Sequence, residues 1–155
     1  MKSESAPYRI RLARKKDIPS IIKLRDLDWP GDSGWMTKSI ATNLIQDNPK
    51  TCWVMEIDGK VIGARIVCDD FENRAWGWTL MISPEYKRKG YGTILFKDTN
   101  RILKNMGYRC LFSVCDPTNV PSKNWHKKMG HKTLCVLPRW FFDDSDASLF
   151  YYGLK

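Results

Sequence analysis

The stretch that decides the fold is Leu80-Met81-Ile82-Ser83-Pro84-Glu85-Tyr86-Lys87-Arg88-Lys89-Gly90-Tyr91-Gly92-Thr93. It starts as the end of an apolar strand, turns through a basic loop with two glycines, and continues into a helix that we expect over residues 93–106. Glycines let the backbone approach a ligand closely, and the first N–H groups of a helix have no partner within it. The helix dipole and the three basic side chains of residues 87–89 add positive charge. The stretch therefore predicts an anion site, above all for a phosphate.

The glycine loop does not match two common phosphate-binding motifs. The Walker A pattern GxxxxGK followed by Ser or Thr is absent. Only two of the three glycines of a dinucleotide-binding fingerprint are present, and no βαβ unit follows them. Taken alone, the loop is also compatible with an ordinary helix start and solvated lysines. The sequence on both sides of the loop is therefore needed to distinguish an anion site from an ordinary helix start.

Hydrophobic periodicity and turn signals place strands and helices on both sides of the loop. Before it we expect a strand over 8–13, a helix capped by Asp17 and ending near Asp28, a helix over 36–46, strands over 52–57 and 60–68 joined by Asp58-Gly59, and a strand over 75–82. After it we expect Gly107 just past the helix, a strand over 109–114, a short helix capped by Ser122 and ending at Gly130, and strands over 133–142 and 149–154. No repeat or linker interrupts this order. We predict one α+β domain over residues 1–155, built around a central sheet.

The strand, the sequence Lys87-Arg88-Lys89-Gly90-Tyr91-Gly92 and the apolar helix together resemble motif A of the GNAT N-acyltransferase superfamily, usually written Gln/Arg-x-x-Gly-x-Gly/Ala. The order of elements is also similar to that of the family, so the resemblance spans nearly the entire chain. It implies an α+β fold with a mixed, mostly antiparallel sheet flanked by helices. It also implies transfer of an acetyl group from acetyl-CoA, the co-substrate, to an amine of a small molecule or a protein.

The resemblance assigns cofactor-binding residues by position. The end of the strand, Met81 and Ile82, contacts the pantetheine arm, and residues 87–92 cradle the pyrophosphate. The full set that the resemblance implies is Met81, Ile82, Lys87, Arg88, Lys89, Gly90, Tyr91, Gly92, Thr93 and Asn119. The family's usual Gln or Arg is Lys87 here, which still donates hydrogen bonds but lacks a forked geometry.

A second match lies around the last helix, where the family often shows Asn-x-x-Ala/Ser-x-x-x-Tyr-x-x-x-Gly-Phe. Asn119, Ser122, His126 and Gly130 fall at these spacings, and His131 replaces the Phe. The resemblance makes His126 the catalytic residue that protonates the leaving thiolate, a task that the family's Tyr commonly performs. An imidazole can act as an acid, with an unperturbed pKa of about 6.5. The alternative is a partly exposed helix residue without a catalytic task.

The general base remains open. Many family members carry a Glu on the fourth strand, where this chain has Trp76-Gly77-Trp78. The nearest carboxylates are Asp116, Asp69 and Asp70, which are equally suited to capping and turns. A water chain is a further alternative. Among the seven tryptophans, Trp29 and Trp35 are candidates for contacting the acceptor or for structure, and we expect Trp53 and Trp140 to serve packing.

Composition bounds the class of protein. Hydrophobic residues make up 43% and charged residues 28%, as in soluble folded proteins. No apolar run of 18 residues and no secretory signal are present, so we expect neither a membrane span nor secretion. The five cysteines lie in apolar runs without CxxC pairs, which predicts buried reduced thiols. We therefore expect a cytoplasmic protein without disulfides or a bound metal.

The net charge of +9 is concentrated in three segments, 1–25, 87–109 and 119–132. Coenzyme A phosphates account for the second and third, and an outward Arg9 and Arg11 on the first strand contribute to the first. This surplus keeps an alternative open, in which the enzyme modifies nucleic acid or aminoacyl-tRNA held by its basic surface. A third alternative is a non-enzymatic binder of the cofactor. We expect a monomer or homodimer, and neither the acceptor nor the acyl chain length follows from the sequence.

Overall fold

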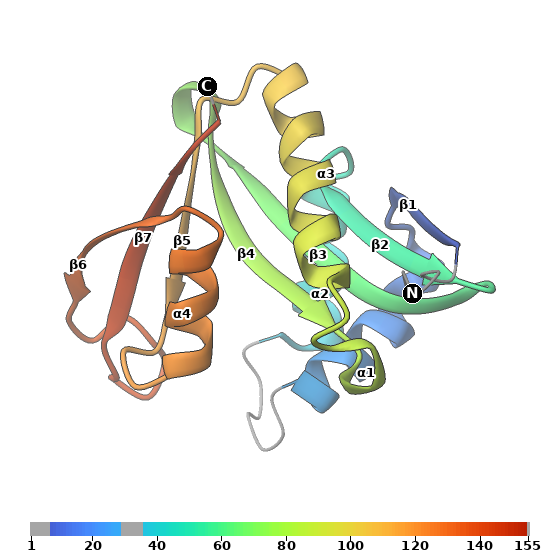
Figure 1. Ribbon diagram of the computed structural model, residues 1–155, viewed down its shortest axis with the longest axis horizontal. Helices are drawn as coiled ribbons and strands as arrows, with labels where there is room; N and C mark the ends of the chain where they lie inside the picture. The colour runs from blue at the N-terminus through green and yellow to red at the C-terminus, as the bar shows by residue number, and fades with distance from the viewer. Residues whose placement is uncertain (1–6, 29–35, 155) are drawn as a thin grey trace, which may run out of the picture. The chain divides into compact units, whose positions relative to one another are not determined.

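The computed structural model describes residues 7–28 and 36–154 (Figure 1). Its strands and helices follow as β1 (Tyr8–Leu12), α1 (Ile18–Asp28), α2 (Lys38–Asp47), β2 (Cys52–Ile57), β3 (Lys60–Asp70), β4 (Arg74–Ile82), α3 (Tyr91–Asn105), β5 (Cys110–Cys115), α4 (Val120–Lys128), β6 (Lys132–Leu137) and β7 (Ala147–Gly153). Short 3-10 turns precede α1, β4 and the glycine loop. The predicted order of strands and helices is confirmed. The strand expected over 133–142 is too long, because it ends at Leu137 before Pro138.

Seven strands of the described residues form one sheet in the order β1-β2-β3-β4-β5-β7-β6. The pairs β1–β2, β2–β3, β5–β7 and β6–β7 are antiparallel, and β4–β5 is parallel. The sheet is therefore mixed and mostly antiparallel, as predicted. The pairing of β4 with β5 covers three residue pairs and ends at Trp76 and Phe112.

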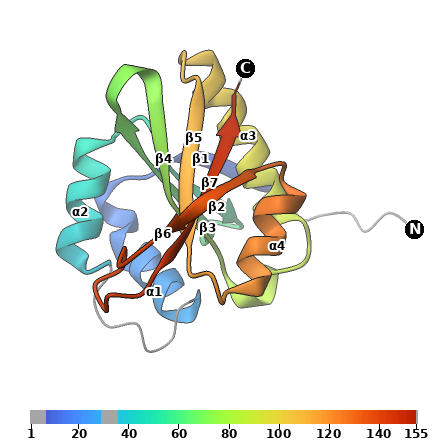
Figure 2. The same ribbon diagram turned by 90° about the vertical axis from the view of Figure 1, so that its left-hand side faces the viewer.

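The chain divides into two compact units, residues 1–67 with 79–99 and residues 68–78 with 100–155. The prediction that residues 1–155 act as a single domain stays a prediction. In the first unit α1 and α2 lie side by side (Figure 2). Its core contains Ile21 of α1, Met55 of β2, Ile62 of β3 and Leu95 of α3, all fully buried. The turn between β2 and β3 has the two left-handed residues of a tight hairpin, Asp58 and Gly59, as predicted.

Two predictions at the start of the chain are wrong. Arg11 does not point freely outward: its guanidinium forms ion pairs with Asp17 and Glu56, and its side chain is 12% exposed. Asp17 ends a 3-10 turn directly before α1, and its carboxylate accepts the N–H of Arg14 at 2.8 Å rather than capping α1. The N-terminal cationic surplus is therefore smaller than the sequence suggests.

The second unit packs Leu103 of α3, Leu111 of β5 and Phe150 of β7 into its core. Gly107 follows α3 with φ +94°, and the N–H of Tyr108 donates to Leu103 O, so its predicted role after the helix is confirmed. The cap of α4 lies three residues before the predicted Ser122. Asn119 is the N-cap, and its Oδ1 accepts the N–H of Ser122 at 3.1 Å.

All five cysteines lie among the described residues, and none of them forms a disulfide bond there. Three of them, Cys52, Cys110 and Cys115, are buried as predicted, Cys68 is half-buried, and Cys135 on β6 is exposed. The prediction of a buried thiol is therefore wrong for Cys135, because β6 is exposed along most of its length. Within residues 7–28 and 36–154, no helix is long and apolar enough to cross a membrane.

Candidate functional site

The glycine loop is held at both ends by backbone hydrogen bonds. Ser83 N–H donates to Ile62 O at 2.8 Å, and Ile94 N–H of the first turn of α3 donates to Gly90 O at 3.0 Å. Between them, Arg88 and Gly90 adopt left-handed conformations with φ +59° and +88°. Left-handed residues in a turn direct successive N–H groups toward one side, which makes a concave anion site. The loop therefore has the backbone geometry that a phosphate needs.

The two glycines of the loop have different surroundings. A Cβ placed on Gly90 would meet no atom within 4 Å, so the space beside Gly90 is open to a ligand. A Cβ on Gly92 would lie 3.5 Å from Ile82 Cγ1, in ordinary van der Waals contact with the strand end. The strand end is itself buried, with Met81 and Ile82 exposed by 1% and 7%. The predicted cofactor residues 81–82 and 87–93 thus lie together in the first unit, and their role stays a prediction.

Three charged side chains of the loop, Glu85, Lys87 and Lys89, have protein partners. Lys87 donates to Asp28, the last residue of α1. Lys89 lies 5.6 Å from the centre of the Tyr86 ring, which packs edge-on against Tyr91. Glu85 accepts a hydrogen bond from Lys60 at 2.5 Å, and this contact lowers the pKa of the Glu85 carboxyl. The loop is therefore tied to α1 and to the β2–β3 turn by ion pairs at its surface.

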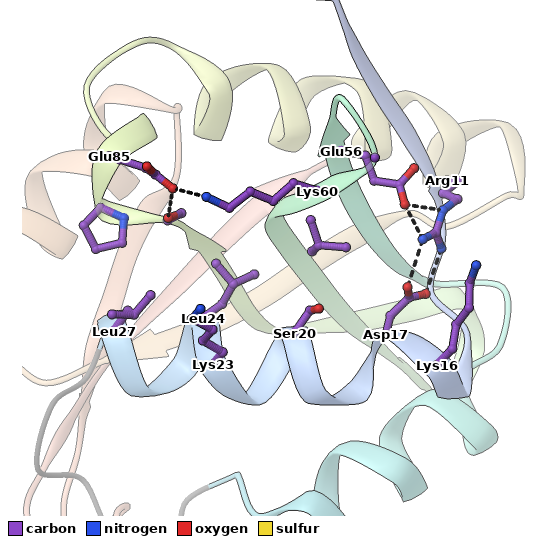
Figure 3. A pocket seen from close by; sticks show the side chains of 14 residues that line it. Arg11, Lys16, Asp17, Ser20, Lys23, Leu24, Leu27, Glu56, Lys60 and Glu85 are labelled. Atoms are coloured by element: carbon purple, nitrogen blue, oxygen red, sulfur yellow. Dashed lines mark hydrogen bonds and ion pairs between the residues drawn. The ribbon is translucent and has the colours of Figure 1, made fainter.

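A cavity of about 580 Å³ lies beside α1 in the first unit (Figure 3). Lys60 and Glu85 stand at one end of it, and Arg11, Asp17 and Glu56 stand at the other. Arg11 Nη1 and Nη2 bind the two carboxylate oxygens of Asp17 at 2.7 and 2.9 Å, which lowers the pKa of Asp17. None of the predicted cofactor residues lines this cavity. The Arg11 cluster has no local signal in the sequence, since Arg11 and Glu56 are 45 residues apart.

His126 of α4 is buried, with 8% exposure, and its ring stacks on Phe150 at 4.2 Å between centroids. Its Nδ1 lies 2.8 Å from the carbonyl oxygen of Ser122, and its Nε2 lies 3.1 Å from Ser113 Oγ. A carbonyl oxygen only accepts, so Nδ1 carries the proton, and Nε2 of the neutral ring accepts the hydroxyl of Ser113. Burial lowers the pKa of His126, although the Ser122 carbonyl acts in the opposite direction. The resting ring is therefore neutral at neutral pH.

The alternative that His126 is a partly exposed helix residue without a catalytic task is therefore wrong about its exposure, because the side chain is buried. Asn119 lies at the start of the same helix, where its side-chain oxygen serves as the N-cap. Its role in binding the cofactor stays a prediction. The sequence analysis did not single out Ser113, the partner of His126. The signal for it is a hydroxyl in the otherwise apolar strand Cys110–Cys115.

The carboxylates considered as bases all have structural partners. Asp116 Oδ1 accepts from the N–H and the hydroxyl of Thr118 at 2.7 and 2.6 Å. Asp69 accepts from the Tyr108 hydroxyl at 2.7 Å, and Asp70 lies 3.6 Å from Arg74 Nε. These contacts favour turn and surface roles for the three carboxylates.

The tryptophans have mixed surroundings. Trp76 stacks on Trp140 with centroids 5.8 Å apart and an interplanar angle of 23°. Trp140 therefore packs as expected, but its side chain is 47% exposed. Trp53 of β2 is buried, as expected. Trp29 and Trp35 lie outside the described residues.

Known proteins resemble the chain over most of its length. The model of the acetyltransferase (GNAT) family matches residues 18–131. An N-alpha-acetyltransferase of Sulfurisphaera tokodaii is 26% identical over 160 residues, covering 92% of this chain and 90% of the relative. Ard1 from Thermoplasma volcanium superposes with a TM-score of 0.85 and 18% identity, over 94% of this chain and 97% of that one. The ribosomal-protein-S18-alanine N-acetyltransferase from Escherichia coli gives a TM-score of 0.81 and 16% identity, over 96% and 95%.

The family match covers both units and includes the glycine loop and His126. The predicted α+β GNAT fold is confirmed, and the alternative of a non-enzymatic binder is not supported. This chain belongs to the acetyltransferase (GNAT) family and is an acyl-CoA-dependent N-acetyltransferase.

Proposed function

We propose that the acceptor is the α-amino group of a polypeptide and that the acyl donor is acetyl-CoA. The observation that carries the acceptor class is the similarity to an N-alpha-acetyltransferase over nine-tenths of both chains. Sequence alone left small-molecule and protein amines open, and this proposal narrows the choice to one kind of protein amine.

The chemistry of the described residues supports the same choice. Residues 76–78 of β4 offer no carboxylate to deprotonate an ammonium group. An α-amine has a pKa near 7.7–8.0, so about a quarter of it is neutral at pH 7.4, whereas only about one lysine side chain in a thousand is neutral there. A site without a carboxylate base at this position therefore suits an α-amine better than a lysine.

The glycine loop supports acetyl-CoA as the donor. In the proposal the N–H groups of residues 87–93 and the side chain of Lys87 hold the pyrophosphate, and Met81 and Ile82 contact the pantetheine arm. The open space beside Gly90 and the left-handed backbone of the loop fit this use. Asn119 contributes its side-chain amide nitrogen, since its oxygen is occupied by the cap.

Calorimetric titration with coenzyme A tests the loop. Gly90→Asp places a carboxylate in the open space where a pyrophosphate is proposed, and Asp tolerates a left-handed backbone better than most residues. Gly59→Asp is the matched control, because Gly59 is also left-handed and a Cβ added there would also meet no atom within 4 Å. We expect Gly90→Asp to weaken binding more than about tenfold and Gly59→Asp to leave it unchanged. Equal affinities for the two variants would refute the cradle.

Mass spectrometry of acetylated peptides tests the acceptor. One peptide carries a free N-terminus and one internal lysine, and its twin carries the same lysine behind a blocked N-terminus. We expect one acetyl group on the first peptide, located at the α-amine by fragmentation, and none on the second. Acetylation of the lysine in both peptides would contradict the proposal.

The remaining parts of the proposal concern partners and location. We place the enzyme in the cytoplasm, which the mostly buried cysteine thiols support. The basic surface that favours a nucleic-acid or aminoacyl-tRNA acceptor is smaller than the sequence suggests, because Arg11 is ion-paired with two carboxylates. Monomer and homodimer both remain compatible with the proposal.

A further inference from the structure

Ser113 and His126 form a buried polar pair in the second unit. Ser113 and His126 are 9% and 8% exposed, and their Oγ and Nε2 atoms are 3.1 Å apart. Buried polar side chains cost free energy unless they are bonded, and both ring nitrogens of His126 are bonded. The neutral ring presents a bare Nε2 to the serine, which is the arrangement of a base that can receive the hydroxyl proton.

The pair lies directly after the last residue pair of β4 and β5. Their pairing ends at Trp76 and Phe112, and the next residues are Gly77 and Ser113. A Cβ on Gly77 would lie 3.7 Å from Ser113 Cβ, in ordinary van der Waals contact, so Gly77 lies directly beside the serine and places no side chain of its own against it. Gly77 is also one of residues 76–78 of β4, where the family resemblance predicts a Glu as the base and this chain has no carboxylate. Ser113 of the neighbouring strand places a hydroxyl at that level.

We propose that Ser113 and His126 form a proton relay for acetyl transfer, in which Ser113 contacts the attacking nitrogen and His126 acts through Ser113. This inference rests on the proposed transfer to an α-amine. As the amine nitrogen bonds to the thioester carbonyl carbon, its proton passes to Ser113 Oγ and the hydroxyl proton of Ser113 passes to His126 Nε2. When the C–S bond breaks, the leaving thiolate receives a proton back through the same hydroxyl. One proton moves from nitrogen to sulfur, and both residues return to their starting state.

The surroundings of His126 can hold the transient positive charge. The Nδ1–H donates to the Ser122 carbonyl at 2.8 Å, and the ring belongs to the last turn of α4, where the helix dipole favours a cation. The titratable and charged groups around it are His131, whose ring centre is 4.7 Å away, Tyr152 of β7 behind His131, Cys115 of β5 beside Ser122, and Lys123, Lys127 and Lys128 of α4. Phe150 of β7 covers the ring face. Burial keeps the resting ring neutral.

The relay and a simple acid role predict opposite pH profiles. If His126 were only a proton donor, it would have to start protonated, and kcat would fall as pH rises through its pKa. In the relay it must start neutral, so kcat rises as pH rises through a pKa below 6.5, and deprotonation of the α-amine adds a second, separate rise near pH 7.7–8.0. We expect the rising profile, measured with both substrates saturating. A falling profile would overturn the relay.

Nitrogen NMR gives a readout that does not depend on activity. The chain has only two histidines, so the His131→Gln variant assigns the signals. We expect the His126 ring to be the neutral form protonated at Nδ1 at pH 7, with a pKa below 6.5. A ring that is protonated at Nε2, or charged at pH 7, would overturn the proposal.

Variants of the serine separate the relay from a structural role. We expect Ser113→Ala to lower kcat about 100-fold while coenzyme A affinity is unchanged, and Ser113→Thr to restore most of the rate. Ser148→Ala is the control, because Ser148 is a serine of similar burial on β7, and it should keep the wild-type rate. A Ser113→Ala enzyme with the wild-type rate would refute the relay. Failure of the wild type to acetylate any peptide while it binds coenzyme A would instead refute the proposed acceptor.

Discussion

Lys87, the first residue of the proposed pyrophosphate cradle, is ion-paired with Asp28, the residue that ends α1. The lysine is 43% exposed and the aspartate 23%, so the pair is accessible from solvent. A carboxylate bound to the lysine competes with a phosphate for the same ammonium group and repels the phosphate charge. If Lys87 holds the pyrophosphate as proposed, Asp28 lowers the affinity of the enzyme for the cofactor.

The first prediction follows from this competition. We expect Asp28→Asn to tighten coenzyme A binding about three- to tenfold, because it removes the competing charge and leaves Lys87 in place. Calorimetric titration measures the change. Asp26→Asn is the control, since Asp26 lies on the same helix, is 60% exposed and pairs with Arg25. Weaker binding in Asp28→Asn would mean that Asp28 orients Lys87 instead of competing for it.

The second prediction concerns the stability of the Arg11 cluster. Arg11 lowers the pKa of Asp17, so the ionised carboxyl stabilises the folded state at pH values above its unfolded pKa of about 3.9. This contribution is lost as pH falls through the lower pKa of the folded state. We expect Asp17→Asn to lose about 1.5–3 kcal/mol at pH 7, which is the usual range for hydrogen bonds to charged groups.

Urea denaturation at pH 7 and at about pH 3 measures this effect. The difference between wild type and Asp17→Asn should shrink at the lower pH, since pH 3 lies below the unfolded pKa of about 3.9 and the unfolded wild-type chain then takes up a proton at Asp17. Glu85→Gln is the comparison, because its pair with Lys60 is solvent-exposed and should contribute little. A difference that is the same at both pH values would show that Asp17 acts through something other than its charge.

Local signals in the sequence are sufficient to predict the order of the helices and strands and the position of the glycine loop. Asp58-Gly59 and Gly107 each predict a left-handed turn from residue type alone, and both adopt one. The predicted N-cap of α4, Ser122, is three residues too late, because Asn119 and Ser122 are both of residue types that commonly cap helices. Pro121 near the first turn places the start at Asn119.

The parts that could not be predicted depend on residues far apart in the chain. Arg11 pairs with Glu56 across two strands, and His126 pairs with Ser113 across a loop and a helix turn. Neither pairing leaves a periodic or local pattern, because strand register and helix docking decide it. The burial of His126 follows from its packing on Phe150, which lies 24 residues further along.

The third prediction tests the nucleic-acid alternative. Because the chain carries a net charge of +9, we expect a gel shift with total tRNA at about 20 mM salt and none at about 150 mM. Non-specific binding of this kind depends on counterion release and is lost steeply with salt. A shift that persists at the higher salt would favour a nucleic-acid partner over a peptide acceptor.

The fourth prediction compares two glycines that surround the end of β4. A Cβ on Gly63 would lie 2.7 Å from Ile82 Cδ1 and 3.1 Å from the carbonyl oxygen of Met81, so the end of the Ile82 side chain has to move and the Met81 carbonyl has to give by a few tenths of an ångström. A Cβ on Gly92 would make only ordinary contacts with Ile82 and Leu80, and Gly92 lies in the first turn of α3. We expect Gly63→Ala to lose about 1–3 kcal/mol, as overpacked cores do. We expect Gly92→Ala to be as stable as the wild type or slightly more so, since Ala restricts the unfolded chain.

The same pair of variants also reports on the cofactor site, because Met81 and Ile82 are the proposed pantetheine contacts. Gly63→Ala should weaken coenzyme A binding, since it displaces both residues, while Gly92→Ala should keep it, since the added methyl group points toward the strand end. Urea denaturation and calorimetric titration of the two proteins measure both effects. If Gly63→Ala is destabilised but binds coenzyme A with unchanged affinity, the end of β4 does not contact the cofactor. If Gly92→Ala is stable but no longer binds coenzyme A, the cofactor approaches the backbone most closely at Gly92 itself. The cradle then extends further into α3 than the open space beside Gly90 indicates.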